Sequence, residues 1–289
     1  MLARMFSGLA IVVLVITGSS IAQEKFKLEY KLKPGEQIVS KVYHEAETET
    51  NISGTSEGSR SQTTSIKVWE VKSTEKGGNI TFVYSIDSVD MQQSIGDGEE
   101  LKYNSKSDKE APKIFQRVAE TVQKPLATIT INRFGEVIKR DNELKSPLMG
   151  IGDLAVPLPP EPVAVGAEWQ VPRDLRVRLD DGTYKVIKVR ELYKLEKVSN
   201  GIATIRIESQ PLTPVSDPSI EAQLIQQLSK GAIKFDLDTG RLISKKLDWS
   251  ENVVGFRGAE SSMRYNATWS EELLPATART AATKPAASK

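Results

Sequence analysis

The stretch APKIFQRVAETVQKPLATITINRFGEVIKR, residues 111–140, decides the expected fold, because the chain repeats its pattern at residues 217–246, DPSIEAQLIQQLSKGAIKFDLDTGRLISKK. Each copy places a proline near its start and continues with apolar residues at helical spacing. It then alternates apolar and polar residues around a glycine, Gly135 in the first copy and Gly240 in the second. The first half of each copy predicts an amphipathic helix, and the second half predicts a β-hairpin.

Both predicted helices have an apolar face. Phe115 and Val118 lie on that face in the first helix, which we expect to end at Lys124 before Pro125. Leu224 and Leu228 lie on it in the second helix. One helix covers only a few strands, so the two halves of the chain should share a single core.

Alternation of apolar and polar residues with period two dominates the rest of the chain and predicts strands. Glycine-containing turns separate many of these runs, for example at Pro34-Gly35 and Asn200-Gly201. The run 53–65 is poor in apolar residues and is either a long polar loop or a pair of exposed strand tips, while 96–109 reads as a mobile loop. The predicted strands are 26–32, 37–52, 66–72, 79–88, 126–131, 136–139, 175–179, 184–198, 202–208, 242–254 and 261–271.

The element order β-β-β-β-α-β-β occurs twice, in residues 23–142 and in residues 163–274. We therefore expect an α+β fold, mostly β, in which a large, curved, half-barrel-like antiparallel sheet built from two pseudo-repeats packs on two helices. Gene duplication with fusion is the simplest source of the repeat, and convergent patterning is the alternative.

A proline-rich linker, residues 143–162, joins the two halves. Its five prolines favour an extended path over the surface. Its apolar residues should pack against the body of the protein; they are Leu148, Met149, Ile151, Leu154 and Val156.

The two ends of the chain differ from the body. Residues 1–22 form a predicted signal peptide, with Arg4 before the apolar run 9–16 and a small-x-small cleavage site at Ser20 and Ala22. Cleavage would leave Gln23 first and no membrane span, so we expect an exported protein, periplasmic or extracellular. Residues 275–289 contain no large apolar side chain and should be disordered.

Composition excludes several function classes. The chain has 39 basic and 38 acidic residues, so no net field attracts nucleic acid. It has no Cys and one His, which removes disulfides, thiolate nucleophiles and cysteine-rich zinc sites. We expect no cofactor and no metal, and we expect that the protein is not an enzyme.

Three local patterns have a chemical and a structural interpretation. His44 lies on a strand among glutamates that looks exposed, and no nucleophile accompanies it. The alternating Glu45, Glu47 and Glu49 suit a solvated strand face better than a cation site. The segment 236–240, DLDTG, resembles part of a calcium loop but lacks the later glutamate, so a turn capped by side chains is favoured.

Four tryptophans occur in the predicted strands or at their ends: Trp69, Trp169, Trp249 and Trp269. They form either part of the core or a platform for stacking carbohydrate. Core packing is the more common role of aromatic residues that alternate along strands.

Three phrases resemble a known family: LKPGE at 32–36, LPPEPVAVGAEW at 158–169 and FDLDTGRL at 235–242. They are similar to those of exported bacterial proteins of unknown function, of a type frequent in planctomycetes. The resemblance implies export and supplies no activity and no catalytic residues. A looser similarity, at the level of the fold, is to the lipoprotein-carrier half-barrels of the bacterial envelope, whose curved sheet and covering helices enclose an acyl chain.

Two functions remain. The first is a non-enzymatic binding or carrier protein of the cell envelope for a lipid or other apolar ligand. The second is a structural module with a solid core that interacts with an envelope protein. An open apolar cavity between sheet and helices would favour the first. The residues expected to line that groove are Phe82, Tyr84, Phe115, Val118, Leu224, Leu228 and Tyr265.

Overall fold

The computed structural model describes residues 23–142, 155–179 and 181–275 of the 289-residue chain. The predicted signal peptide, most of the linker and nearly all of the predicted tail lie outside the described residues. The strands are β1 (Lys25–Phe26), β2 (Gln37–Ile52), β3 (Thr55–Thr74), β4 (Ile80–Ile95), β5 (Leu101–Asn104), β6 (Pro125–Ile131), β7 (Val137–Asn142), β8 (Val163–Ala164), β9 (Glu168–Arg178), β10 (Tyr184–Ser199), β11 (Ile202–Pro211), β12 (Lys230–Asp236), β13 (Arg241–Val254) and β14 (Ser261–Leu273). The helices are η1 (Lys113–Phe115), α1 (Gln116–Ala119) and α2 (Pro218–Leu224).

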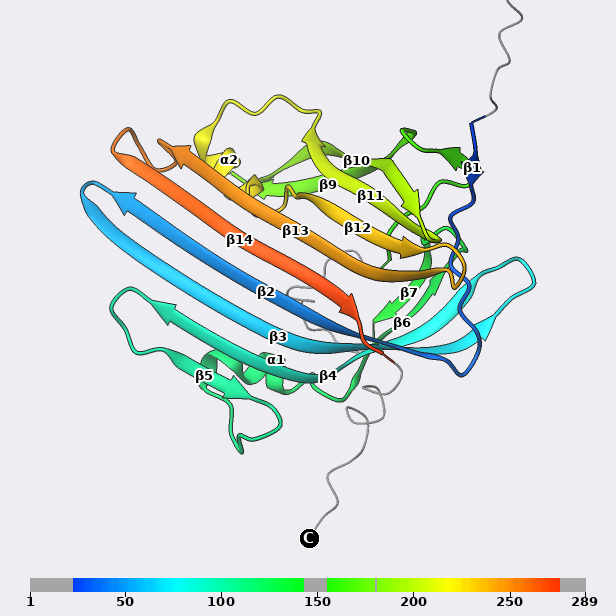
Figure 1. The fold of residues 1–289 in the computed structure, drawn as a ribbon. Helices are drawn as coiled ribbons and strands as arrows, with labels where there is room; N and C mark the ends of the chain where they lie inside the picture. The colour runs from blue at the N-terminus through cyan, green and yellow to red at the C-terminus, as the bar shows by residue number, and fades with distance from the viewer. Residues whose placement is uncertain (1–22, 143–154, 180, 276–289) are drawn as a thin grey trace, which may run out of the picture.

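One large antiparallel sheet of twelve strands forms the body of the protein and curves into a half-barrel (Figure 1). Its strand order is β7-β6-β4-β3-β2-β14-β13-β12-β11-β10-β9, with β5 paired to β4. The sheet is not closed, because β7 and β9 are its two edges. Strands β1 and β8 pair separately. The expected mostly β fold with a curved antiparallel sheet is confirmed.

The sheet consists of two meanders that meet where β2 pairs with β14. In the first meander α1 precedes β6, and in the second α2 precedes β12. Strands β5 and β14 have no counterpart in the other meander. The duplication itself stays a prediction.

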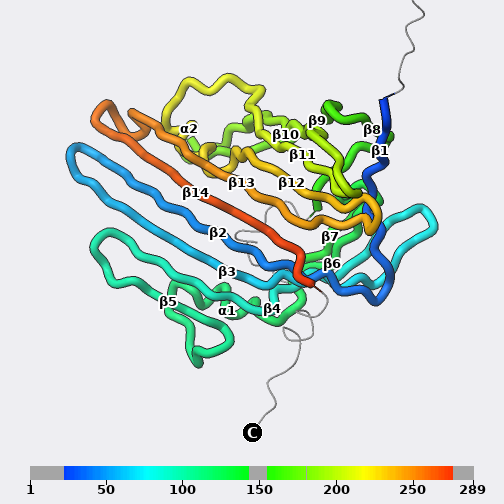
Figure 2. The backbone as a smooth tube through the Cα atoms, viewed as in Figure 1, coloured from blue at the N-terminus to red at the C-terminus, as the bar shows by residue number. Residues whose placement is uncertain are grey.

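The segment after β1 runs through the inside of the sheet. The alternation predicted for 26–32 is present, since Leu28, Tyr30 and Leu32 are buried. However, only Lys25–Phe26 belongs to a strand. The rest of the segment lies between the β6–β7 and β12–β13 turns: Tyr30 N–H donates to Arg133 O at 2.8 Å and Lys31 N–H to Gly240 O at 3.2 Å. Figure 2 shows this blue segment crossing that end of the sheet.

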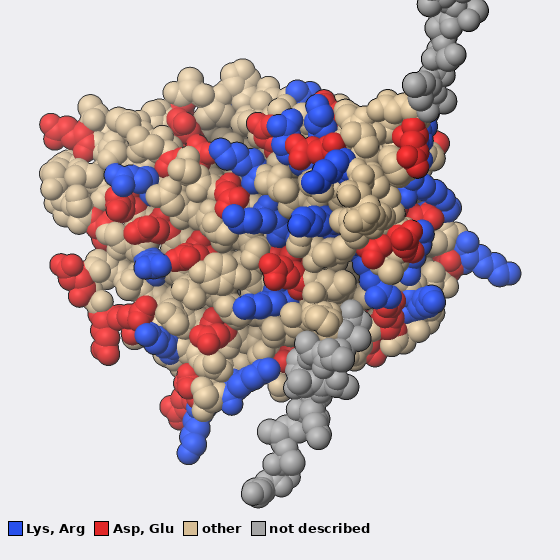
Figure 3. Space-filling model, viewed as in Figure 1, with Lys and Arg blue, Asp and Glu red and all other residues tan. Residues whose placement is uncertain are grey.

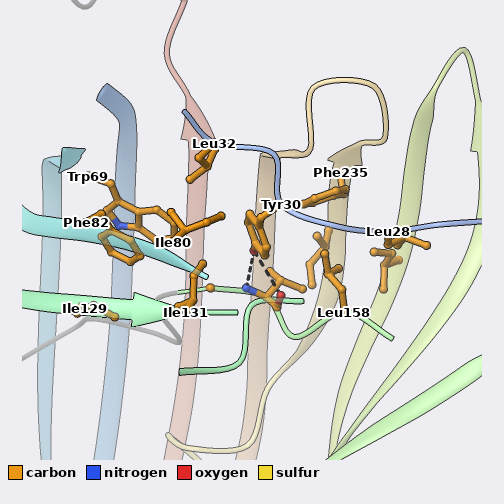
Figure 4. Close-up of a cluster of buried hydrophobic side chains, with 14 of the residues drawn as sticks. Leu28, Tyr30, Leu32, Trp69, Ile80, Phe82, Ile129, Ile131, Leu158 and Phe235 are labelled. Carbon is orange, nitrogen blue, oxygen red and sulfur yellow. Dashed lines mark hydrogen bonds between the residues drawn. The ribbon is translucent and has the colours of Figure 1, made fainter. Parts of the chain in front are cut away.

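Residues 155–158 pack beside this segment and confirm one part of the linker prediction. Val156 and Leu158 are buried, and the Tyr30 hydroxyl accepts a hydrogen bond from Val156 N–H at 2.8 Å (Figure 4). Leu158 N–H donates to Phe134 O at 2.7 Å. The other four apolar linker residues, Leu148, Met149, Ile151 and Leu154, lie outside the described residues.

The central core is therefore filled mainly by extended chain and by strand side chains. Trp69 stacks on Phe82 with ring centroids 4.2 Å apart, and both face the same cluster as Tyr30 (Figure 4). Tyr30 also packs edge-on against Phe235 of β12, at 5.3 Å. We name the buried residues Leu28, Tyr30, Leu32, Val156 and Leu158 the interior plug, because they fill one end of the half-barrel.

The two helices are much shorter than expected, which corrects the prediction that they cover the sheet. Helix α1 has four residues after a single 3₁₀ turn, no side chain caps its start, and Gln123 at φ +60° directs the chain into β6. Ile114, next to Phe115 in this turn, is 49% exposed. Short helices gain too few internal hydrogen bonds to extend without a packing surface.

Helix α2 forms a wedge inside the half-barrel at the end opposite the plug. The Asp217 carboxylate accepts from Ser219 N–H at 2.9 Å, and Pro218 occupies the first turn, as is typical of helix starts. Leu224 packs against β9 and β10. Ile225, just after the helix, packs against β13 and β14. Figure 1 shows α2 close to the ends of these strands.

Loop predictions had mixed outcomes. The run 53–65 forms strand tips, because β2 and β3 continue to a tight turn at Ser53-Gly54. This favours the pair of strand tips over the long polar loop. The expected loop 96–109 contains β5. In the 236–240 segment, Asp236 Oδ1 accepts from the amides of Asp238 and Thr239, both at 2.9 Å, so this segment is the predicted turn.

The face of the sheet seen in Figure 3 carries acidic and basic side chains interspersed, without a patch of one sign. Within the described ranges, no helix has the length and apolar character needed to cross a membrane.

Candidate ligand-binding cavity

A cavity of about 1070 Å³ lies on the inner face of the sheet, between the interior plug and the wedge formed by α2, and it is open to solvent. Its lining comes from β2, β9, β10, β13 and β14, from the β6–β7 hairpin, from 155–160 and from the residues after α2. Both sheet edges contribute, because the curvature brings the β7 and β9 sides to the same hollow.

The floor of the cavity is set by strand register. Lys245, Leu247 and Trp249 alternate along β13 and share one face. Leu247 lies opposite Trp269 of β14, and Trp269 lies opposite His44 of β2. Directly opposed residues share a face, so these side chains lie side by side at the base of the hollow.

The walls of the cavity are mostly apolar. Trp169 stacks on Tyr193, with centroids 5.6 Å apart, and its indole N–H donates to Pro157 O at 3.0 Å. Phe134 and Leu158 complete the wall on the plug side. These contacts hold Trp169 in one orientation.

Glu191 is a buried carboxylate at the β10 side of the cavity. It is 2% exposed. Its Oε1 lies 2.5 Å from Arg173 Nη1, and its Oε2 accepts from the Tyr193 hydroxyl at 2.7 Å. Arg173 belongs to β9 and Glu191 to β10, so this ion pair joins the two strands.

A second buried ion pair joins Lys67 of β3 to Glu271 of β14, next to the interior plug. Burial lowers the pKa of the Lys67 ammonium, and the nearby Glu271 carboxylate opposes that shift. Lys245 lies opposite Glu271 in register, with its Nζ 5.7 Å from the ring centroid of Trp269.

Two indole groups on the floor have buried N–H donors without an acceptor. The Nε1 atoms of Trp249 and Trp269 are buried and make no hydrogen bond. Trp169, in contrast, is satisfied. Buried donors are nearly always bonded in folded proteins, and the buried Nε1 atom of Trp69 in the central core lacks a partner as well.

His44 faces the cavity, which corrects the expectation of an exposed histidine among glutamates. Strand alternation places Glu45 and Glu47 on the opposite, outer face. Burial lowers the pKa of the His44 imidazole, so it is neutral at pH 7. Across the described ranges, no group of three or more His, Cys, Asp or Glu side chains is placed to hold a metal ion.

The seven residues predicted to line one groove lie in four places. Tyr265 lines the cavity. Phe82 and Tyr84 lie in the central core. Phe115 and Val118 pack with Tyr103 in a separate cluster at β4 and β5. The last two, Leu224 and Leu228, line a smaller hollow of about 570 Å³ beside α2.

Sequence reasoning did not include Lys245 or Leu247 of the floor in any ligand site. The alternation of Lys245, Leu247 and Trp249 was visible, but their inner position depends on β14 and α2. Trp69 and Trp269 belong to the buried core, and Trp169 and Trp249 pack partly buried against it. Trp169, Trp249 and Trp269 also line the cavity. The carbohydrate platform stays a prediction.

No family model matches the chain, and no curated protein matches it. Among solved structures, a DUF1329 family protein from Desulfovibrio piger is 12% identical, with 78% of this chain and 83% of that chain covered and a TM-score of 0.15. OccK11 (OpdR) from Pseudomonas aeruginosa is 8% identical, with 86% and 100% covered and a TM-score of 0.17. At these TM-scores the likeness supports no conclusion about this chain. The resemblance to exported planctomycete-type proteins stays a prediction.

Proposed function

We propose that this protein is a non-enzymatic binding or carrier protein whose ligand is largely apolar and occupies the cavity on the inner face of the sheet. The observation that supports this most directly is the open hollow of about 1070 Å³ with Trp169, Trp249, Trp269 and Tyr265 in its lining. Small-molecule sites are concave, mostly apolar and usually ~300–1,000 Å³ in volume.

The rigidity of the surroundings also supports a preformed site. The interior plug fills one end and α2 lies at the other, and Trp169 and Trp249 between them are only partly buried. Exposed aromatic surface inside a stable hollow gains free energy when an apolar ligand displaces water, at roughly 25 cal/mol per Å² buried.

The second candidate, a structural or protein-interaction module of the envelope, requires a solid interior. The plug end meets that requirement, since Leu28, Phe82 and Phe235 are fully buried there. The cavity end does not. The volume and lining of the cavity therefore favour the carrier proposal.

A cavity-filling variant with a matched control tests the proposal. Val171 of β9 lines the cavity, whereas Val186 of β10 is 46% exposed. We expect Val171→Trp to weaken binding of a fluorescent fatty-acid probe at least about tenfold, equal to ~1.4 kcal/mol. Val186→Trp adds the same ring outside the cavity and should leave probe affinity unchanged.

Melting temperatures of both variants establish that they are folded. If the wild-type protein does not bind the probe, or if both variants bind it as the wild type does, the cavity is not the ligand site. Native mass spectrometry of the purified protein gives an independent readout, since a carrier is expected to retain a co-purifying lipid.

We also propose that the protein is exported, because residues 1–22 have the pattern of a signal peptide. These residues lie outside the described ones. N-terminal sequencing of the protein from its native host should show Gln23 as the first residue. An intact Met1 would contradict export through this signal.

A further inference from the structure

We propose that the outer face of the β9–β10 hairpin docks on an anionic lipid bilayer. The docking surface consists of exposed or half-buried residues of these two strands: Arg176, Arg178, Tyr184, Val186, Lys188 and Arg190. The cavity lining includes none of them, so this inference goes beyond the proposed function and has a separate test.

Strand register places these side chains on one face of the sheet. Tyr184 lies opposite Arg178, and Val186 lies opposite Arg176. Directly opposed residues share a face, and so do residues two apart along a strand. The remaining two residues of the docking surface therefore follow Val186 along β10, on the same side.

The other face of the hairpin is buried against α2. Its side chains form one apolar cluster with two residues of the helix, and the members are Leu175, Val177, Ile187, Val189, Ile220 and Leu224. Strand β9 is also an edge of the sheet. The docking surface is thus held from behind and lies at the rim of the half-barrel, where a flat bilayer can reach it.

Apolar side chains protrude at this rim. Tyr184 is 67% exposed and Val186 is 46% exposed. Leu212 is 54% exposed, and its N–H donates to Lys188 O at 2.8 Å. Tyrosine is enriched at membrane interfaces because its ring is apolar and its hydroxyl is polar. Charged side chains alone would protect a sheet edge from pairing with another chain, and that role requires no exposed apolar residues.

The four cations of the docking surface form no ion pair within the part of the chain that the structure describes. On the paired residues 170–178 and 184–192, Asp174, opposite Lys188, is the one carboxylate that shares their face. Arg190 donates to the side-chain amides of Gln210, at 2.9 Å, and Gln170, at 3.3 Å. The surface therefore carries an excess of positive charge.

Two cations farther across the outer face differ in this respect. Arg206 Nε lies 3.7 Å from Glu196, and Lys246 Nζ lies 3.3 Å from Asp248. Cations without such partners are free to contact lipid phosphates, and each one near an anionic bilayer strengthens binding by about fivefold. An acidic protein would match the charge as well. The protruding tyrosine and valine favour the bilayer, because apolar side chains among cations suit the boundary between headgroups and acyl chains.

Sedimentation with lipid vesicles tests the inference on the exported protein, purified from its native host. We expect binding to vesicles of phosphatidylglycerol and phosphatidylcholine in equal parts to be at least about tenfold tighter than to phosphatidylcholine alone. The difference should shrink as salt is added, because salt screens exposed charges. Runs without vesicles exclude sedimentation by aggregation.

Two double variants that remove the same charge provide the matched comparison. Arg176→Gln with Arg178→Gln should weaken binding to the anionic vesicles at least about tenfold. Arg206→Gln with Lys246→Gln, on the same outer face, should change it less than about threefold. All variants keep the same N-terminus, so the N-terminus does not account for a difference between them.

A third double variant tests the apolar contribution. Tyr184→Ser with Val186→Ser changes no charge and should weaken binding to the anionic vesicles at least about threefold. Melting temperatures establish that each variant is folded. If this variant binds as the wild type does, the apolar side chains do not enter the bilayer and the proposal fails.

Other outcomes overturn the proposal in different ways. If the protein binds neither kind of vesicle, or both equally, the surface is not a docking site for an anionic bilayer. If the two charge variants weaken binding alike, net charge and not this surface drives it. If soluble polyglutamate binds through Arg176 and Arg178 while the vesicles do not, the partner is an acidic protein. Binding of the fatty-acid probe enters none of these outcomes, so the carrier proposal is judged separately.

Discussion

Replacing Gly240 with alanine tests how the N-terminal segment is held inside the sheet. Gly240 lies in the β12–β13 turn at φ +61°, and a Cβ there would lie 2.5 Å from Lys31 N and 2.6 Å from Glu29 O. Ordinary contacts of such a Cβ are 3.4–4 Å. Both neighbours are backbone atoms, so no side-chain rotation relieves the overlap, and the segment containing Tyr30 must move.

Two terms set the size of the effect. Alanine in the left-handed region costs about 1–2 kcal/mol. Displacing well-packed chain costs about 1–3 kcal/mol more. We therefore expect Gly240→Ala to lower the free energy of unfolding by about 2–5 kcal/mol. Gly35 has φ +79° and no atom within 4 Å of a Cβ, so Gly35→Ala should cost only the first term, about 1–2 kcal/mol.

Urea unfolding, followed by circular dichroism and tryptophan fluorescence, measures both free energies. The slope with urea should be the same for both variants, so that the difference in midpoint reports stability. Equal losses for Gly240→Ala and Gly35→Ala, within about 0.5 kcal/mol, would refute the close packing of the N-terminal segment on this turn.

The remaining predictions concern a satellite cluster, the histidine and the buried ion pair. Phe115 is buried and stacks on Tyr103, so Phe115→Ala should lower the free energy of unfolding by about 3–5 kcal/mol and leave binding of the fatty-acid probe unchanged. A small loss of stability together with altered probe binding would instead support its predicted place in the groove. Burial lowers the pKa of His44 below 6.5, so the unfolded chain binds this proton at a higher pH than the folded protein does, and the contribution of His44 to stability falls as the pH drops below 6.5. NMR titration of this single imidazole should show the lowered pKa, and a value at or above 6.5 would contradict its burial. Glu271→Gln should lower the free energy of unfolding by about 3–5 kcal/mol, because it leaves the buried Lys67 ammonium without its carboxylate, and adding Lys67→Met should recover most of that loss in the same assay. If the effects of the two substitutions simply add, the pair is not coupled.

The sequence predicted the strands well, because their signals are local. Period-two alternation identified the buried residues of β14, Tyr265, Ala267 and Trp269, with no reference to their partners. Positive φ at Gly135 and Gly240 agrees with the turns predicted there. Such features depend on a few adjacent residues, whose backbone preferences and side-chain directions follow from covalent geometry.

Helical spacing was a weaker guide. The apolar residues Phe115 and Val118 recur as in an amphipathic helix, yet the helix itself stops at Ala119. The same spacing is satisfied by a 3₁₀ turn followed by one α-turn. Propensity sets a small preference per residue, and the surrounding packing decides how far a short helix extends.

The sequence by itself therefore determined a mostly β chain with known turns and one apolar face on each strand. Only the tertiary structure decided which face of the polar strand β2 lies inside the half-barrel, and this places His44 in the cavity lining. It also decided what fills the interior: Lys31 is hydrogen-bonded to Gly240, and Tyr30 to Val156, each across more than a hundred residues of chain. The plug, the wedge and the cavity between them depend on such distant contacts. Packing in the folded chain brings these segments together against the entropy of closing long loops, and no local sequence pattern encodes that packing.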